Sequence, residues 1–134
     1  MPGSFVDTNV LVYLASGDPA KADRAEAIAA GGGTISVQVL NELANVARRE
    51  MGLSWTETHA FLSTVRALLT IAPLTGEGHD TGLALAERHG ISIHDAMIVA
   101  AALRAGCDRL WSEDMRDGLV IENRLRISNP FRSG

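Results

Sequence analysis

The chain has 134 residues, of which 46% are hydrophobic, and 12 Lys and Arg residues against 16 Asp and Glu residues give a formal net charge of -4. This length and composition predict a single folded domain, residues 1–134, and exclude a disordered chain. Cys107 is the single cysteine, which excludes an intrachain disulfide and a thiolate zinc site and favours a cytoplasmic protein. The longest apolar run, residues 96–103, is far below the roughly 18 residues of a membrane span, so we expect no span and no export signal.

Hydrophobic periodicity and stop signals predict short strands that alternate with helices. We expect strands at residues 4–6, 34–36, 70–74 and 109–112, and a candidate fifth strand at 125–128. Between them we expect helices at residues 9–15, from Asp18-Pro19 to the Gly31-Gly32-Gly33 stop, at 37–50, and from the Ser54/Glu57 capping box to residue 68. Two more helices are expected at 79–89 and from His94 or Asp95 to the Gly106 stop. Strands joined by helical crossovers predict an α/β fold, in which a parallel sheet of four to five strands forms a three-layer sandwich with helices on both faces.

Four acidic residues interrupt or end apolar segments, and they are the most informative feature of the sequence. Asp7 and Asp114 follow predicted strands, Asp95 stands at the start of an apolar helix, and Glu42 lies between Leu40 and Leu43. In open α/β sheets the carboxyl edge of the strands is where ligands bind. Ionised carboxylates beside an apolar interior need a compensating charge, and basic residues are scarce near them.

Carboxylates without lysine, histidine or thiolate ligands select a hard cation, so we expect Mg²⁺ or Mn²⁺. The natural substrate for such a site is a phosphate ester. Lys21 is the only lysine in the sequence, which excludes a P-loop or kinase-type phosphate site.

Each acid also has a purely structural interpretation. Asp7 and Asp95 are candidate helix N-caps, Glu42 a solvated helix position and Asp114 a turn residue. A simultaneous coincidence of all four is the weaker explanation. His94, beside Asp95, is interpreted as a cap or core-edge histidine in preference to a catalytic one.

Four segments together resemble a known family. Phe5-Val6-Asp7-Thr8-Asn9-Val10 resembles the opening of PIN domains, in particular VapC-type toxin ribonucleases of bacterial toxin-antitoxin modules, and residues 36–43, 94–102 and 110–114 are similar to the second, third and fourth motifs of that family. The resemblance implies a PIN-like sandwich and a Mg²⁺-dependent endoribonuclease that hydrolyses RNA phosphodiesters with a metal-activated water. It implies that the metal-binding and catalytic carboxylates are Asp7, Glu42, Asp95 and Asp114, with Thr8 and Ser112 as supporting hydroxyls.

Two further residues have open roles. Asp117 lies three residues after Asp114 and is either an alternative fourth ligand or a supporting group, and we favour Asp114. Asn9 either orients backbone or water beside Asp7 or is a plain helix cap. The resemblance further implies a cognate antitoxin that blocks the acidic site, and a homodimer.

Two other functions remain as alternatives. A phospho-aspartate phosphatase or receiver-like domain would use an aspartate at a strand end, but Asp7-Thr8-Asn9 lacks the second aspartate of an Asp-x-Asp motif, and no lysine follows a late strand. A non-catalytic PIN-like binding module would keep the fold without the chemistry. The intact acids favour the nuclease.

Overall fold

The computed structural model describes residues 3–132. Its strands are β1 (Ser4–Val6), β2 (Thr34–Ser36), β3 (Thr70–Ala72), β4 (Arg109–Trp111), β5 (Val120–Ile121) and β6 (Leu125–Ser128). Its helices are α1 (Thr8–Val12), the 3₁₀ helix η1 (Tyr13–Ala15), α2 (Pro19–Ala30), α3 (Val37–Arg49), α4 (Trp55–Leu68), α5 (Gly76–His89) and α6 (Ile93–Arg104).

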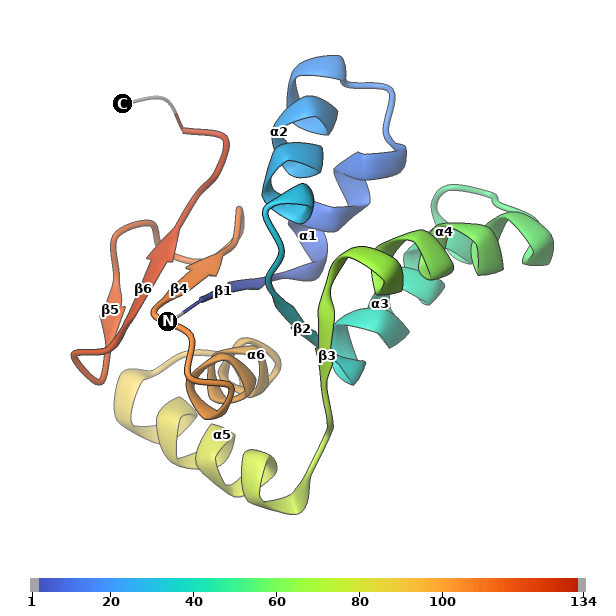
Figure 1. Cartoon of the computed structure of the whole chain (residues 1–134). Coiled ribbons are helices and arrows are strands. Elements are labelled where there is room, and N and C mark those ends of the chain that lie inside the picture. The colour runs from blue at the N-terminus through green and yellow to red at the C-terminus, as the bar shows by residue number, and fades with distance from the viewer. Residues whose placement is uncertain (1–2, 133–134) are drawn as a thin grey trace.

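The strands form one sheet with β1 near its centre. The strand order is β3-β2-β1-β4-β6-β5, and every pair except β5 with β6 is parallel. Figure 1 shows α5 and α6 below the sheet and α1 and α2 above it, with α3 and α4 beyond β2 and β3. The predicted α/β class, a mostly parallel sheet between helices, is confirmed. Because β1 and β4 are adjacent and parallel, the residues that follow them meet at one edge of the sheet.

The sheet has six strands, one more than the four to five expected. The additional strand is β5, which forms a hairpin with β6. Glu122 and Asn123 both have positive φ, and Arg124 N donates to Ile121 O at 3.0 Å, as in a type I′ turn. The sequence signal was weak because β5 is only two residues long and its turn lacks the usual glycine.

Three predicted helix boundaries were wrong. The first predicted helix is divided into α1 and the 3₁₀ helix η1. Helix α5 begins at Gly76, because the Thr75 side chain accepts a bond from Gly78 N at 2.9 Å. Helix α6 begins at Ile93 because Ser92 is its N-cap and accepts from Asp95 N at 3.1 Å.

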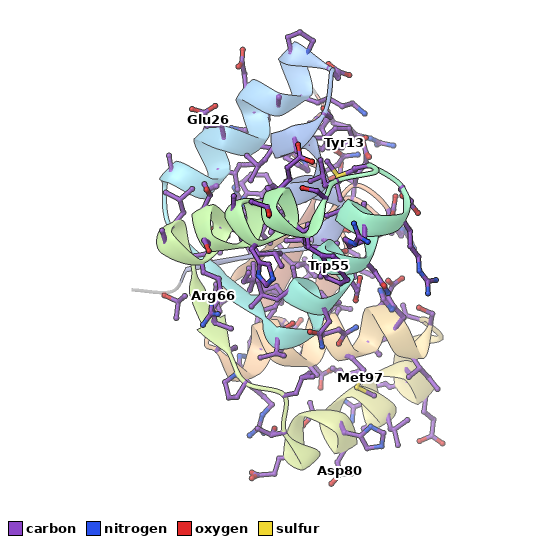
Figure 2. All side chains as sticks on the ribbon, turned by 90° about the vertical axis from the view of Figure 1, so that its right-hand side faces the viewer. Tyr13, Glu26, Trp55, Arg66, Asp80 and Met97 are labelled. Atoms are coloured by element: carbon purple, nitrogen blue, oxygen red, sulfur yellow. The ribbon has the colours of Figure 1, made fainter. Side chains whose placement is uncertain are left out.

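Buried aliphatic and aromatic side chains fill the space on both faces of the sheet. Phe5, Val6 and Leu110, from the central strands, are fully buried. Helices α5 and α6 pack closely at Gly82, where an added Cβ would lie 2.5 Å from the sulfur of Met97. Met97 is labelled in Figure 2. Among residues 3–132, no helix is both long enough and apolar enough to cross a membrane.

Candidate active site

Asp7 is the most buried acid of the sheet edge. It follows β1 directly and is the N-cap of α1, because its Oδ1 accepts from Thr8 N at 2.7 Å. The other oxygen, Oδ2, accepts from Ser112 Oγ at 2.9 Å. The Asp7 backbone donates to Trp111 O at 2.9 Å, which extends the β1–β4 pairing by one residue. Asp7 is 5% exposed, so its charge is largely removed from water.

The pKa of Asp7 is raised from 3.8 to about 6. Burial is the main cause, and the nearby charges of Glu42 and Asp95 raise it further, whereas the bonds from Ser112 and Thr8 lower it. If Asp7 served only as the N-cap of α1, there would be no reason for the carboxylates of Glu42 and Asp95 to lie close to it. The N-cap interpretation of Asp7 is therefore correct but incomplete.

Glu42, on the second turn of α3, faces Asp7 across the edge of the sheet. Its Oε2 accepts from Thr8 Oγ1 at 3.0 Å and lies 3.2 Å from His94 Nε2. Its Oε1 is buried and has no hydrogen-bond partner. A buried carboxylate oxygen without a donor is costly, and its position in the cleft fits a ligand atom for a cation.

Asn9 joins the ends of β1 and β4. Its amide Nδ2 donates to Asp7 Oδ2 at 3.2 Å and to Asp114 Oδ2 at 3.2 Å, and its Oδ1 accepts from Glu113 N at 3.0 Å. Asn9 is not a helix cap, since Asp7 occupies that position. The orienting role is therefore the one that the geometry favours, and Asn9 fixes the separation of Asp7 and Asp114.

The four predicted carboxylates line one cleft of about 430 Å³. Asp95 is not an N-cap, because it lies in the first turn of α6 and its own N–H donates to the side chain of the N-cap, Ser92. The lining residues include six carboxylates and no lysine or arginine; the full set is Asp7, Thr8, Asn9, Val12, Tyr13, Glu42, Val46, Glu50, His94, Asp95, Glu113 and Asp114. Within residues 3–132, no three acidic, cysteine or histidine side chains are spaced closely enough to form a preassembled metal site.

Asp117 is not among the residues that line the cleft. Its Oδ1 accepts from Asn129 N at 2.8 Å, and its Oδ2 lies 3.8 Å from Arg132 Nη1. The geometry therefore gives Asp117 a role in holding the chain after β6 and favours Asp114 as the fourth acid.

Sequence reasoning missed Glu113 and Tyr13 and undervalued His94. Glu113 accepts from Tyr13 Oη at 2.7 Å and from Lys21 Nζ at 2.7 Å. Burial raises the pKa of Glu113, but these two bonds outweigh it, so that the pKa lies below its ordinary value. His94 is neither a cap nor a core residue, since its side chain is 56% exposed and faces Glu42. No local pattern in the sequence pointed to Glu113, because its partner Lys21 lies 92 residues away in the chain.

The residues of the cleft fit a divalent cation. A hard cation would bond to the unpartnered Glu42 Oε1. It would also offset the cost of burying the Asp7 charge, which is the main cause of its raised pKa, and the smaller repulsion from Glu42 and Asp95. The donors are carboxylate oxygens with supporting hydroxyl and amide groups, which is the set that Mg²⁺ and Mn²⁺ prefer.

Comparison with known proteins agrees with this geometry. The family model for the PIN domain matches residues 4–116. No curated protein sequence is significantly similar to the chain. Among solved structures, a toxin-antitoxin complex from Klebsiella pneumoniae matches with a TM-score of 0.73 and 22% identity over 97% of this chain and 99% of that one.

Two further solved structures have the same fold. DNA-bound VapBC from Salmonella typhimurium matches with a TM-score of 0.73 and 18% identity over 97% of this chain and 99% of that one. Mycobacterium tuberculosis VapC20, described as a toxin that cleaves the sarcin-ricin loop, matches with a TM-score of 0.67 and 19% identity over 83% of this chain and 89% of that one. At these identities the likeness establishes the fold.

Proposed function

The chain belongs to the PIN domain family, and from this premise we propose that it is a Mg²⁺- or Mn²⁺-dependent endoribonuclease of the VapC toxin type. One observation carries the proposal: carboxylates from four separate segments, Asp7, Glu42, Asp95 and Asp114, line a single cleft whose lining contains no lysine or arginine. An RNA phosphodiester needs a cation to enter such a cleft, because its own charge is negative.

We assign the divalent cation to these four carboxylates. When bound, Mg²⁺ neutralises phosphodiester oxygens and lowers the pKa of a coordinated water. The chain's own residues orient these carboxylates. The Thr8 hydroxyl donates to Glu42, and the Ser112 hydroxyl donates to Asp7. The Asn9 amide donates to both Asp7 and Asp114 and so fixes their relative position.

His94 is placed to contact the substrate. Its ring is 56% exposed at the rim of the cleft and lies 3.2 Å from Glu42 Oε2. An imidazole N–H at this position offers a hydrogen-bond donor to a phosphate oxygen of the substrate.

The partners follow from the proposed toxin type. Two of the solved structures with the same fold are toxin-antitoxin complexes. By analogy, we propose that the present chain binds a cognate antitoxin that blocks its acidic cleft. A homodimer and a cytoplasmic location belong to the same proposal.

The test is a cleavage assay on purified single-stranded RNA. We expect cutting with Mg²⁺ or Mn²⁺, loss with EDTA, and loss in Asp7→Asn, while the matched control Asp80→Asn, an exposed residue of α5 (Figure 2), retains the parent rate. Cleavage by folded Asp7→Asn at the parent rate would refute the mechanism. A covalent phospho-aspartate after incubation with acetyl phosphate would support the phosphoacceptor alternative, and Mn²⁺ binding without cleavage would support a binding module.

A further inference from the structure

Glu113 differs from the other acids of the cleft because both of its carboxylate oxygens are already bonded. Oε1 accepts from Tyr13 Oη and Oε2 accepts from Lys21 Nζ, each at 2.7 Å. Glu113 lines the same cleft as Asp7 and Glu42, and its side chain is 24% exposed. It is therefore within the acidic cleft but is held by donors on the side of η1 and α2.

Lys21 is fixed in place and is not a free surface lysine. Besides Glu113, its ammonium donates to Tyr13 Oη at 3.1 Å and lies 4.7 Å from the centre of the Tyr13 ring and 5.1 Å from that of Phe131. The two rings meet edge to face with centroids 4.9 Å apart. Aromatic faces attract a cation at these distances, so they hold the ammonium at one position.

The Glu113 backbone ties this network to the proposed cation ligands. Its N–H donates to Asn9 Oδ1 at 3.0 Å, and the same asparagine donates to Asp7 and Asp114. A change in the direction of the Glu113 side chain would therefore act on the loop that also carries the next residue, the proposed ligand Asp114.

We propose that Lys21 and Tyr13 are positioning residues that hold Glu113 away from the cation, so that Asp7, Glu42, Asp95 and Asp114 bind it without a fifth carboxylate. This inference rests on the proposed function of the cleft. Loss of the Lys21 charge frees Glu113 to turn inward, where it adds a ligand and draws the cation from its working position. The cation then binds more tightly and RNA cleavage slows.

The test compares Lys21→Met with the double variant Lys21→Met/Glu113→Gln, by calorimetric titration with Mn²⁺ and by RNA cleavage. We expect Lys21→Met to bind Mn²⁺ about threefold to tenfold more tightly, since affinity follows the number of charged ligands, and to cleave about tenfold more slowly. The double variant is expected to return to the parent Mn²⁺ affinity and to recover cleavage. Lys21→Arg, which keeps the charge, is expected to stay close to the parent in affinity.

A merely structural role for Lys21 gives the opposite pattern. In that case Lys21→Met binds Mn²⁺ more weakly and the double variant is no better, and either result overturns the inference. Tyr13→Phe, which removes only the hydroxyl donor, is the second probe if Lys21→Met does not fold, and it is expected to tighten Mn²⁺ binding by a smaller factor. Unchanged or weaker binding there also contradicts the inference.

The titration separates this inference from the proposed function. A parent protein that binds Mn²⁺ but does not cleave RNA refutes the nuclease, while the affinities of the variants still decide the role of Lys21. A parent protein that does not bind Mn²⁺ refutes both.

Discussion

The two sides of the acidic cleft balance their negative charge in different ways. On the side of β1, α3 and α6, the Asp7 carboxylate is buried beside the charges of Glu42 and Asp95, and Glu42 Oε1 has no donor. On the side of η1 and α2, Glu113 is bonded to Lys21 and Tyr13. The fold thus leaves charge unbalanced where a cation fits and balances it next to that place. Four variants test this comparison. Beyond the loss of cleavage in Asp7→Asn proposed above, they are taken from the largest newly expected effect to the smallest.

Glu42→Gln removes a charge from the unbalanced side and is expected to have the largest effect. The neutral amide can still accept the Thr8 hydroxyl, but it is a poor ligand for a hard cation. We expect RNA cleavage to fall more than about 100-fold and Mn²⁺ binding to weaken strongly. The measurements are a cleavage assay and a Mn²⁺ titration, with exposed Glu87→Gln on α5 as the matched control. A Glu42→Gln protein that binds Mn²⁺ like the parent would show that this side of the cleft does not hold the cation.

Ser112→Ala removes a donor to Asp7 and leaves every carboxylate in place. The lost bond stabilised the ionised form of Asp7, so its pKa rises further. We expect a roughly 10- to 100-fold loss of Mn²⁺ affinity, as for other groups that orient metal ligands. The loss should be larger at pH 6 than at pH 8, because more of Asp7 is protonated there. The control is exposed Ser63→Ala on α4; equal losses at both pH values would contradict this role of Ser112.

Asp7→Asn is expected to stabilise the metal-free protein at neutral and alkaline pH while it abolishes cleavage. Because folding raises the pKa of Asp7 from 3.8 to about 6, ionisation in the folded state costs stability as the pH rises through this interval. At 1.36 kcal/mol per pKa unit the cost reaches up to about 3 kcal/mol above pH 6, and asparagine removes it while an amide oxygen remains for the helix cap.

Urea denaturation with EDTA at pH 8 and pH 4 measures this difference. The stability advantage of Asp7→Asn should be present at pH 8 and small at pH 4. Saturating Mg²⁺ should reduce or reverse it, because only the parent gains stability from cation binding. A variant less stable than the parent at pH 8 would mean that the Asp7 charge is compensated without a cation.

Asp117→Asn is expected to have the smallest effect. Its side chain can still accept from Asn129 N, and it loses only a long, exposed contact with Arg132. We expect cleavage within about twofold of the parent and a change in unfolding free energy below about 0.5 kcal/mol, measured by the same assays. A tenfold loss of cleavage would move the fourth acidic role from Asp114 to Asp117.

Most of the architecture could be predicted from local patterns in the sequence. The Ser54/Glu57 capping box is present, and Gly90 ends α5 in the left-handed conformation, because capping depends on groups within one helical turn. Where prediction failed, a polar residue outside the apolar pattern decided the boundary. Thr75 and Ser92 begin their helices earlier than hydrophobic periodicity indicated.

The candidate site was less accessible to sequence reasoning. The spacing of apolar segments placed Asp7 and Asp114 at strand ends, but nothing local distinguished Asp114 from Asp117 or assigned Glu113 a partner 92 residues away. His94 was interpreted as a cap or a core-edge residue, with the helix expected to begin at His94 or Asp95, whereas α6 begins at Ile93 with Ser92 as its N-cap. Long-range contacts decide these roles, and a pattern of neighbouring residues does not encode them.

By itself the sequence determined the alternation of strands and helices and the presence of four acids at the ends of apolar segments, because both follow from hydrophobic burial and local hydrogen bonding. Only the tertiary structure decided which acids share a cleft and which is neutralised. That outcome depends on the parallel pairing of β1 with β4 and on the position of Lys21 beside Tyr13 and Phe131. Electrostatic balance depends on distance in space, and the fold sets that distance.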